Sequence, residues 1–171
     1  IEGNPSHMRS LSLSLPAAVA AVTLVAGASG AADLKLPRPS QKAQVMQTVG
    51  LTDVTIVHSR PGVKGRAIWG GLVPYDKVWR TGANEATTIT FSTEVKIDGK
   101  PLAAGTYSLH TIPTAKEWTV IFNTKADQWG SYSYNDSADA LRIQVKPQPH
   151  EFVECMQFSF NRLGNQLLRS G

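Results

Sequence analysis

The chain has 171 residues, a formal net charge of +4 and a single cysteine, Cys155. One cysteine excludes an internal disulfide, so packing alone must hold the fold together. The Lys and Arg residues are scattered and form no basic stripe, which argues against a nucleic-acid partner.

The N-terminal residues predict an exported protein. Residues 1–7 read as the remnant of a cloning tag, and residues 8–32 as a secretory signal peptide. Residues 11–27 are apolar and carry no charge, and residues 26–28 and 30–32 each offer a small-residue cleavage pattern. A membrane anchor is the alternative, but a spanning helix needs roughly 20 strongly apolar residues. Cleavage would leave one periplasmic or secreted domain with no membrane contact.

The rest of the chain predicts strands. Residues 33–47, which include Pro37 and Pro39, predict an N-terminal arm or linker that could close with a short strand or turn. Residues 48–171 predict a β-domain, because short runs rich in Val, Ile, Thr and aromatics alternate apolar with polar positions. Residues 136–140 allow one helical turn. About eight strands are expected, at residues 53–59, 65–71, 86–92, 94–98, 106–112, 118–123, 141–145 and 152–160.

Strands that follow one another without helices predict antiparallel pairing. We therefore expect a single all-β antiparallel sandwich with Greek-key-like connections, and a small closed barrel is the alternative. Tyr107 follows a glycine turn and leads into a strand, as in the tyrosine corner of Greek-key sandwiches. Its hydroxyl is expected to hydrogen-bond to the backbone.

One dense polar segment, residues 73–91 (VPYDKVWRTGANEATTITF), is the first candidate for a site. It brings Trp79, Arg80, Asn84 and Glu85 together around a glycine, just before a strand. An indole can stack on a ligand, and an amide and a carboxylate can orient it. We predict that these four residues take part in binding a ligand.

Two further arginines precede this segment. Arg60 ends the strand before it and Arg66 begins the next predicted strand. Three guanidinium groups at one end of a sandwich would form an anion site, because arginine forks bind carboxylate or phosphate through two hydrogen bonds. Arg60, Arg66 and Arg80 are therefore the predicted source of charge.

Glu85 has two other interpretations. It could neutralise Arg80 in a buried ion pair that only holds the loop in shape. It could also act as a general acid or base if apolar neighbours raise its pKa. The residues nearby leave all three interpretations of Glu85 open.

No metal or cofactor is expected. His58, His110 and His150 are not spaced as a pair of metal ligands, and there is no second cysteine. The glycines precede predicted strands rather than a helix, so they form no phosphate cradle. Among the aromatic residues, Trp69 and Trp118 are expected in the core.

The motifs together resemble a known family. The segment HSRPGVKGRAIWGGLVPYDKVWRTGANEATTITF, followed by IDGKPLAAGTYSLHTIP, EWTVIFN and QWGSYSYN, is similar to the bacterial family DUF2911 over about residues 45–160. The resemblance implies a periplasmic or secreted β-rich domain. It implies no activity, substrate or cofactor, so no functional residue is carried over from it.

The end of the chain departs from that family pattern. Such domains continue past the FSF strand into a further hairpin, whereas this chain ends in FNRLGNQLLRSG. A missing strand would leave an open sheet edge, which tends to pair with another chain. We therefore expect self-association through a sheet edge.

Three functions remain open at this point. The first is an exported domain that binds a small anionic or polar ligand through the Arg, Trp, Asn and Glu cluster. The second is a hydrolase or isomerase of envelope metabolites, with Glu85 as the acid or base and Arg80 as the electrostatic stabiliser. The third is a structural or assembly module, in which the same residues lock a loop.

Overall fold

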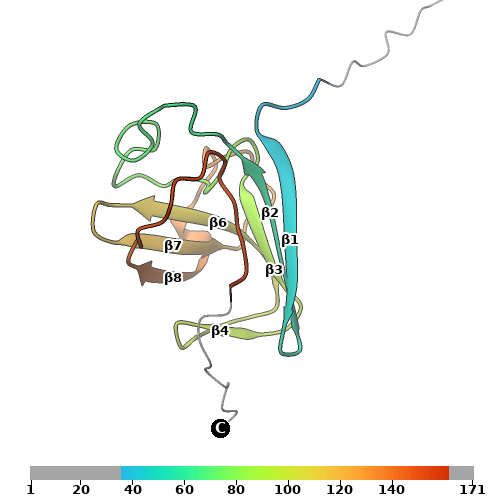
Figure 1. Cartoon of the computed structure of the whole chain (residues 1–171). Helices are drawn as coiled ribbons and strands as arrows, with labels where there is room; N and C mark the ends of the chain where they lie inside the picture. Colours follow the sequence, from blue (N-terminus) through green and yellow to red (C-terminus); the bar gives the residue numbers. More distant parts are fainter. Residues whose placement is uncertain (1–35, 162–171) are drawn as a thin grey trace, which may run out of the picture. The chain divides into compact units, whose positions relative to one another are not determined.

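The structure is a computed structural model that describes residues 36–161 (Figure 1). The predicted tag remnant and signal peptide, residues 1–32, lie outside the described residues. In the described part, eight strands and one short 3₁₀ helix follow in the order β1 (Gln41–Val49), β2 (Thr52–Arg60), β3 (Thr87–Phe91), β4 (Val95–Ile97), β5 (Lys100–Leu102), β6 (Gly105–Pro113), β7 (Trp118–Asn123), η1 (Asp136–Ala138) and β8 (Asp139–Val145).

Six of these strands form one antiparallel sheet in the order β1-β2-β3-β6-β7-β8, and β4 and β5 form a separate hairpin. In Figure 1, β1, β2 and β3 run up and down the view while β6, β7 and β8 run across it, so the sheet bends at the β3–β6 pair. The sheet does not close, because β1 and β8 are its two edges. The predicted all-β sandwich is confirmed, and the barrel alternative is wrong.

The connections are simpler than a Greek key. Apart from the inserted β4–β5 hairpin, the strand order of the main sheet follows the chain, as in a meander. Tyr107 nevertheless makes the contact expected of it. Its buried side chain donates a hydrogen bond from the hydroxyl to the backbone carbonyl of Ala103, at 2.9 Å.

The core lies on one face of the six-stranded sheet. The alternation in β2 and β3 sends most of the apolar side chains to this face, together with the buried Thr87, while Thr88 and Thr90 point the other way. The β4–β5 hairpin and the C-terminal segment cover the core, through Leu102 and through Phe158 and Phe160. The buried members are Val54, Ile56, Ile89, Phe91, Leu102, Tyr107, Leu109, Phe122 and Leu141.

The opposite face of β6 and β7 is also buried, under residues 124–138. His110 is fully buried there, and its ring nitrogens lie 3.1 Å from the hydroxyls of Ser131 and Ser108. Gln128 donates to the Ser108 hydroxyl at 3.0 Å. Burial holds the pKa of His110 down at about 4, so the imidazole is neutral near pH 7.

Three sequence predictions differ from the structure. Residues 41–47, expected in an arm or linker, belong to the nine-residue strand β1. Residues 65–71 form turns instead of a strand, and residues 152–160 form no regular strand beyond a bridge between Gly62 and Cys155. In the described residues, no helix is long and apolar enough to cross a membrane.

Candidate functional site

A long loop carries most of the predicted site. The chain leaves the sheet after β2 and returns at β3, so residues 61–86 lie outside the strands. Backbone hydrogen bonds fix both ends of this loop. Pro61 accepts from Met156 at 3.0 Å, and Trp79 exchanges two bonds with Thr111, at 2.8 and 2.9 Å. The loop is therefore tied to β6 and to the C-terminal segment, rather than free in solvent.

Glycines explain why residues 65–71 turn instead of forming a strand. Gly65 and Gly70 have φ of +66° and +75°, a region that other residues rarely adopt. A Cβ on Gly71 would lie 2.5 Å from the carbonyl oxygen of Ala67, closer than any real Cβ contact. Leu72 donates a backbone bond to that same carbonyl at 3.0 Å. The apolar residues between these glycines are consequently presented on a compact loop.

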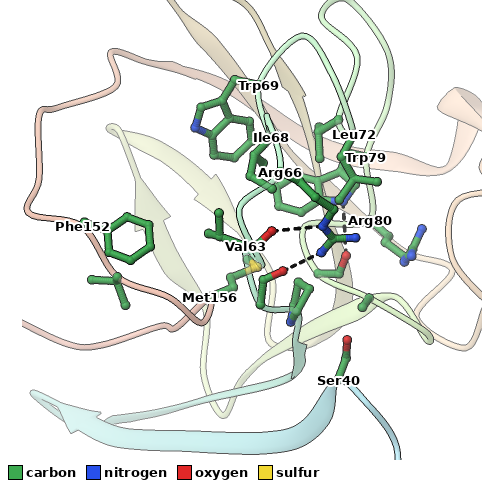
Figure 2. A pocket seen from close by; sticks show the side chains of 16 residues that line it. Ser40, Val63, Arg66, Ile68, Trp69, Leu72, Trp79, Arg80, Phe152 and Met156 are labelled. Carbon is green, nitrogen blue, oxygen red and sulfur yellow. Dashed lines mark hydrogen bonds between the residues drawn. The ribbon is translucent and has the colours of Figure 1, made fainter.

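This loop and the C-terminal segment enclose a pocket of about 760 Å³. Figure 2 shows Phe152 on one side of it, across from Trp69 and Val63 on the other. The walls are mainly apolar, and two arginines and one serine side chain interrupt them. The lining residues are Ser40, Pro61, Gly62, Val63, Arg66, Ile68, Trp69, Leu72, Val73, Trp79, Arg80, Gly82, Ala83, Phe152, Val153 and Met156.

Arg66 supplies the best-placed positive charge in this pocket. Its Nε donates to the carbonyl of Val63 at 3.0 Å, and one terminal nitrogen donates to Gly62 at 2.6 Å (Figure 2). These two bonds use two of the five guanidinium N–H groups. Within residues 36–161, no carboxylate forms an ion pair with Arg66. The backbone thus holds the guanidinium in place, while no carboxylate of the described residues neutralises its charge.

Three tryptophans contact one another through ring edges, and two of them, Trp69 and Trp79, line the pocket. The ring of Trp69 meets Trp79 edge-on at 5.7 Å and Trp118 edge-on at 4.5 Å. Trp79 also donates from its indole nitrogen to the carbonyl of Gly82 at 3.2 Å. Trp69 is 47% exposed, so the prediction that it packs in the core is wrong. Trp69 and Trp79 instead form an aromatic wall of the pocket, and Trp118 packs behind Trp69.

Arg80 and Glu85 do not form the predicted ion pair. Glu85 binds Arg38 instead, with 2.5 Å between Oε1 and the guanidinium. The Nε of Arg80 is buried without a hydrogen-bond partner in the described residues, and its Cδ lies 3.6 Å from where a Cβ on Gly130 would be. The side chain of Arg80 therefore extends from the pocket toward the loop at Gly130.

The environment of Glu85 does not suit a general acid or base near neutral pH. The hydrogen bond from Arg38 holds its pKa below the ordinary value, and burial opposes this only in part. The condition for a role as general acid or base, a pKa raised by apolar neighbours, is therefore not met. Glu85 lines a separate small pocket of about 180 Å³, together with Lys42 and Gln128 among others.

Asn84 and Arg60 have structural contacts. Asn84 adopts φ of +59° and donates from Nδ2 to the carbonyl of Ser40 at 3.2 Å and the hydroxyl of Ser59 at 3.4 Å. Arg60 donates from Nε to the carbonyl of Met156 at 3.0 Å. Neither residue lines the large pocket. Asn84 thus anchors the chain just before β1, and Arg60 anchors the C-terminal segment.

Of the six predicted residues, the structure brings Arg66, Trp79 and Arg80 to the large pocket and leaves the other three outside it. Sequence reasoning missed the wall formed by Phe152, Val153 and Met156. Phe152 is 76% exposed, and an exposed apolar side chain beside a pocket indicates a binding surface. The sequence does not show this signal, because it does not show which side chains are exposed.

The histidines form no metal site in the described residues, which hold no cluster of three His, Cys, Asp or Glu side chains. His58 is buried on the core face, where its ring meets Phe158 edge-on at 4.8 Å. Burial, helped by the charge of Arg60, lowers the pKa of His58, so its imidazole is neutral at pH 7.

The chain was also compared with known proteins. No curated protein and no solved structure matches it. One family model does match, over residues 40–169, and its description is "Protein of unknown function (DUF2911)". That match spans most of the chain and includes every strand of the described residues and all residues that line the large pocket. The chain therefore belongs to the DUF2911 family.

Proposed function

We propose that this protein is an exported binding domain whose large pocket takes a small amphipathic anion. Such a ligand has an apolar or aromatic body and one carboxylate, sulfonate or phosphate group. One observation carries the proposal. A pocket of about 760 Å³ with apolar walls contains the Arg66 guanidinium, which has no acidic partner in residues 36–161.

The walls suit an apolar or aromatic body. Trp69 and Phe152 face the pocket from two separate segments and remain 47% and 76% exposed. Covering these rings would remove apolar surface from water, at about 25 cal/mol per Å². The volume lies within the range of roughly 300–1,000 Å³ that is common for small-molecule sites.

The charge is preorganised for an anion. The bonds to the Gly62 and Val63 carbonyls hold the Arg66 guanidinium in one orientation, so binding costs little side-chain entropy. The remaining N–H groups can donate to an anionic oxygen. A hydrogen bond to a charged group contributes about 1.5–3 kcal/mol. An anion is therefore favoured over a neutral molecule of the same shape.

Export belongs to the same proposal. The support for it is in the sequence, where an uncharged apolar run follows Arg9 and leads to small-residue cleavage patterns. A periplasmic or secreted domain would meet its ligand outside the cytoplasm. Binding would require no membrane contact by the domain itself.

Two dyes that share an aromatic body test the pocket. Anilinonaphthalene sulfonate is anionic, whereas N-phenylnaphthylamine is neutral. We expect saturable binding of both dyes, with the anionic dye bound about tenfold more tightly. Trp69→Ala should weaken both, while Tyr132→Ala, which removes an exposed aromatic outside the pocket, should leave both unchanged. The absence of saturable binding of either dye would reject the proposal.

The other two functions receive less support. A hydrolase or isomerase that uses Glu85 with Arg80 would need these groups to act together, but Glu85 is paired with Arg38 and faces a different pocket. A purely structural module would explain the backbone bonds of Arg60 and Asn84. It would not explain an exposed apolar pocket of about 760 Å³, since exposed apolar surface of this kind marks interaction sites and ligand-binding grooves.

A further inference from the structure

The two edges of the six-stranded sheet are protected very differently. An edge strand exposes a row of backbone N–H and C=O groups, and proteins guard such edges with charges, prolines, bulges or covering segments. β1 is one edge, and Figure 1 shows it along one side of the sheet. Its nine residues, QKAQVMQTV, contain one charge, no proline and no glycine. Its pairing with β2 runs without a register shift from Gln41 to Val49.

The other edge, β8, carries the usual protection. A register shift interrupts its pairing with β7 at Phe122 and Asn123. Arg142 and Asp139 place an ion pair on the strand. Lys100 from β5 donates to the carbonyl of Arg142 at 3.4 Å, so the hairpin reaches this edge. β8 therefore makes a poor partner for an incoming strand, and β1 makes a good one.

We propose that β1 is a docking edge for a second copy of this chain. Two β1 strands would pair antiparallel about a two-fold axis and join two six-stranded sheets into one. A two-fold contact uses the same surface twice and closes on itself. Pairing of β1 with β8 would instead run head to tail into a filament, and the protection of β8 argues against it.

The sequence of β1 is compatible with pairing to itself. Full overlap of the nine residues places Val45 on the two-fold axis, opposite its own copy. Lys42 then lies opposite Thr48 of the partner subunit, so the only charge on the strand does not meet itself. Gln44 lies opposite Met46 of the partner subunit, and Met46 is 51% exposed. No like charges face each other in this register.

The faces of the two sheets also agree in this arrangement. Directly opposite residues of an antiparallel pair lie on the same face of a sheet. Val45 packs against the core, so its copy would extend the same apolar face. The sequence led us to expect an open edge where the family pattern continues past residue 160. The edge proposed here is β1 instead. It is separate from the ligand pocket, which β1 does not line.

Charge placement at positions 44 and 46 tests the proposal. One double variant, Gln44→Lys with Met46→Lys, places two lysine pairs opposite each other across the axis. The matched variant, Gln44→Glu with Met46→Glu, does the same with acidic residues. Neither side chain forms a hydrogen bond within residues 36–161, and each points to the exposed side of β1. Sedimentation velocity over a range of concentrations measures the association, and circular dichroism verifies folding.

We expect the wild type to dimerise and each variant alone to dimerise about tenfold more weakly. An equimolar mixture of the two variants should dimerise again, because Lys then meets Glu at every pair. A wild type that stays monomeric at its highest soluble concentration overturns the proposal. Dimers that persist unchanged in both variants also overturn it, since association then uses another surface.

Discussion

Glu85 forms its ion pair with Arg38, 47 residues earlier in the chain, and not with its near neighbour Arg80. The side chains of Arg38 and Glu85 are 53% and 40% exposed. Together with the bond from Asn84 to Ser40, this pair ties the chain before β1 to the WRTGANE loop. The loop therefore holds the N-terminal segment in place, while Arg66, Trp69 and Trp79 line the pocket proposed to bind a ligand.

Breaking this ion pair should have a small effect on stability. Exposed pairs contribute about 0.2–1 kcal/mol, whereas removing one partner of a buried pair costs about 3–5 kcal/mol. We expect Glu85→Gln and Arg38→Gln each to lower the free energy of unfolding by an amount in the smaller range. The double variant should lose no more unfolding free energy than either single variant. Urea unfolding measures all three. A large and equal loss of unfolding free energy in Arg80→Gln and Glu85→Gln would contradict the pairing of Glu85 with Arg38.

The same pair should respond to acid in a defined direction. Arg38 lowers the pKa of Glu85 below its ordinary 4.5, so the contribution of the pair is complete above that pH. It is lost as pH falls through the lowered folded-state pKa, because the carboxylate must then be protonated. The difference in stability between wild type and Glu85→Gln should therefore shrink in acid. A difference that grows as pH falls would contradict this.

The buried His110 should make the protein less stable in mild acid. Its pKa is about 4 in the folded protein and 6.5 when unfolded, so the unfolded chain binds more protons between these values. The stability from neutral His110 is complete above pH 6.5 and is lost as pH falls toward 4. The difference amounts to roughly 3 kcal/mol. Asp139 opposes the shift, and the hydroxyls of Ser108 and Ser131 and the amide of Gln128 face the ring.

The variant that checks this is His110→Gln, which cannot titrate. We expect it to be less stable than wild type at neutral pH, because it loses the packing of the ring against Tyr134 at 5.0 Å. Its loss of stability between neutral pH and mild acid should be smaller than that of wild type. The residual slope would come from other groups with lowered pKa values, such as His58 and Glu85. Equal slopes in urea unfolding would show that His110 does not titrate as described.

The tyrosine corner should contribute through a single hydrogen bond. Tyr107→Phe removes the bond to the Ala103 carbonyl but keeps the ring packed against Phe91, at 6.4 Å between centroids. We expect a loss of about 0.5–1.5 kcal/mol in the free energy of unfolding. Tyr75→Phe is a matched control, because Tyr75 is partly exposed and its hydroxyl forms no hydrogen bond in the described residues. Equal losses in both variants would argue against a special role for Tyr107.

Export can be checked at the N-terminus of the protein. Signal-peptide cleavage after Ala28 or Ala32 would leave Ser29 or Asp33 as the first residue. Intact-mass measurement of protein recovered from the periplasm or medium should show one of these two ends. Uncleaved protein retained in the membrane fraction would favour the anchor alternative.

Most of the fold could be predicted from the sequence, because strands that bury one face show alternation. β2, β3, β6 and β7 were found in this way, and the helical turn at Asp136–Ala138 was expected. β1 was missed because nearly all of its side chains are exposed, so an edge strand lacks that pattern. The segment at 65–71 was misassigned because its apolar residues serve a glycine turn rather than a strand.

The candidate site was predicted only in part. Arg66, Trp79 and Arg80 were found because their residue types are unusual beside a strand, and they do line the pocket. The partner of Glu85 could not be found, since an ion pair across 47 residues leaves no local signal. Phe152 and Met156 were missed for the same reason, because packing across the fold brings them to the loop after β2.

The most direct test of the ligand site compares two variants that each lose one positive charge. Calorimetric titration with anilinonaphthalene sulfonate would measure the affinity of Arg66→Gln and of Lys96→Gln, where Lys96 is exposed on β4 and outside the pocket. We predict that Arg66→Gln binds the dye about tenfold more weakly than wild type, while Lys96→Gln binds as wild type does. Equal affinities in the two variants would contradict the claim that Arg66 makes this pocket an anion site.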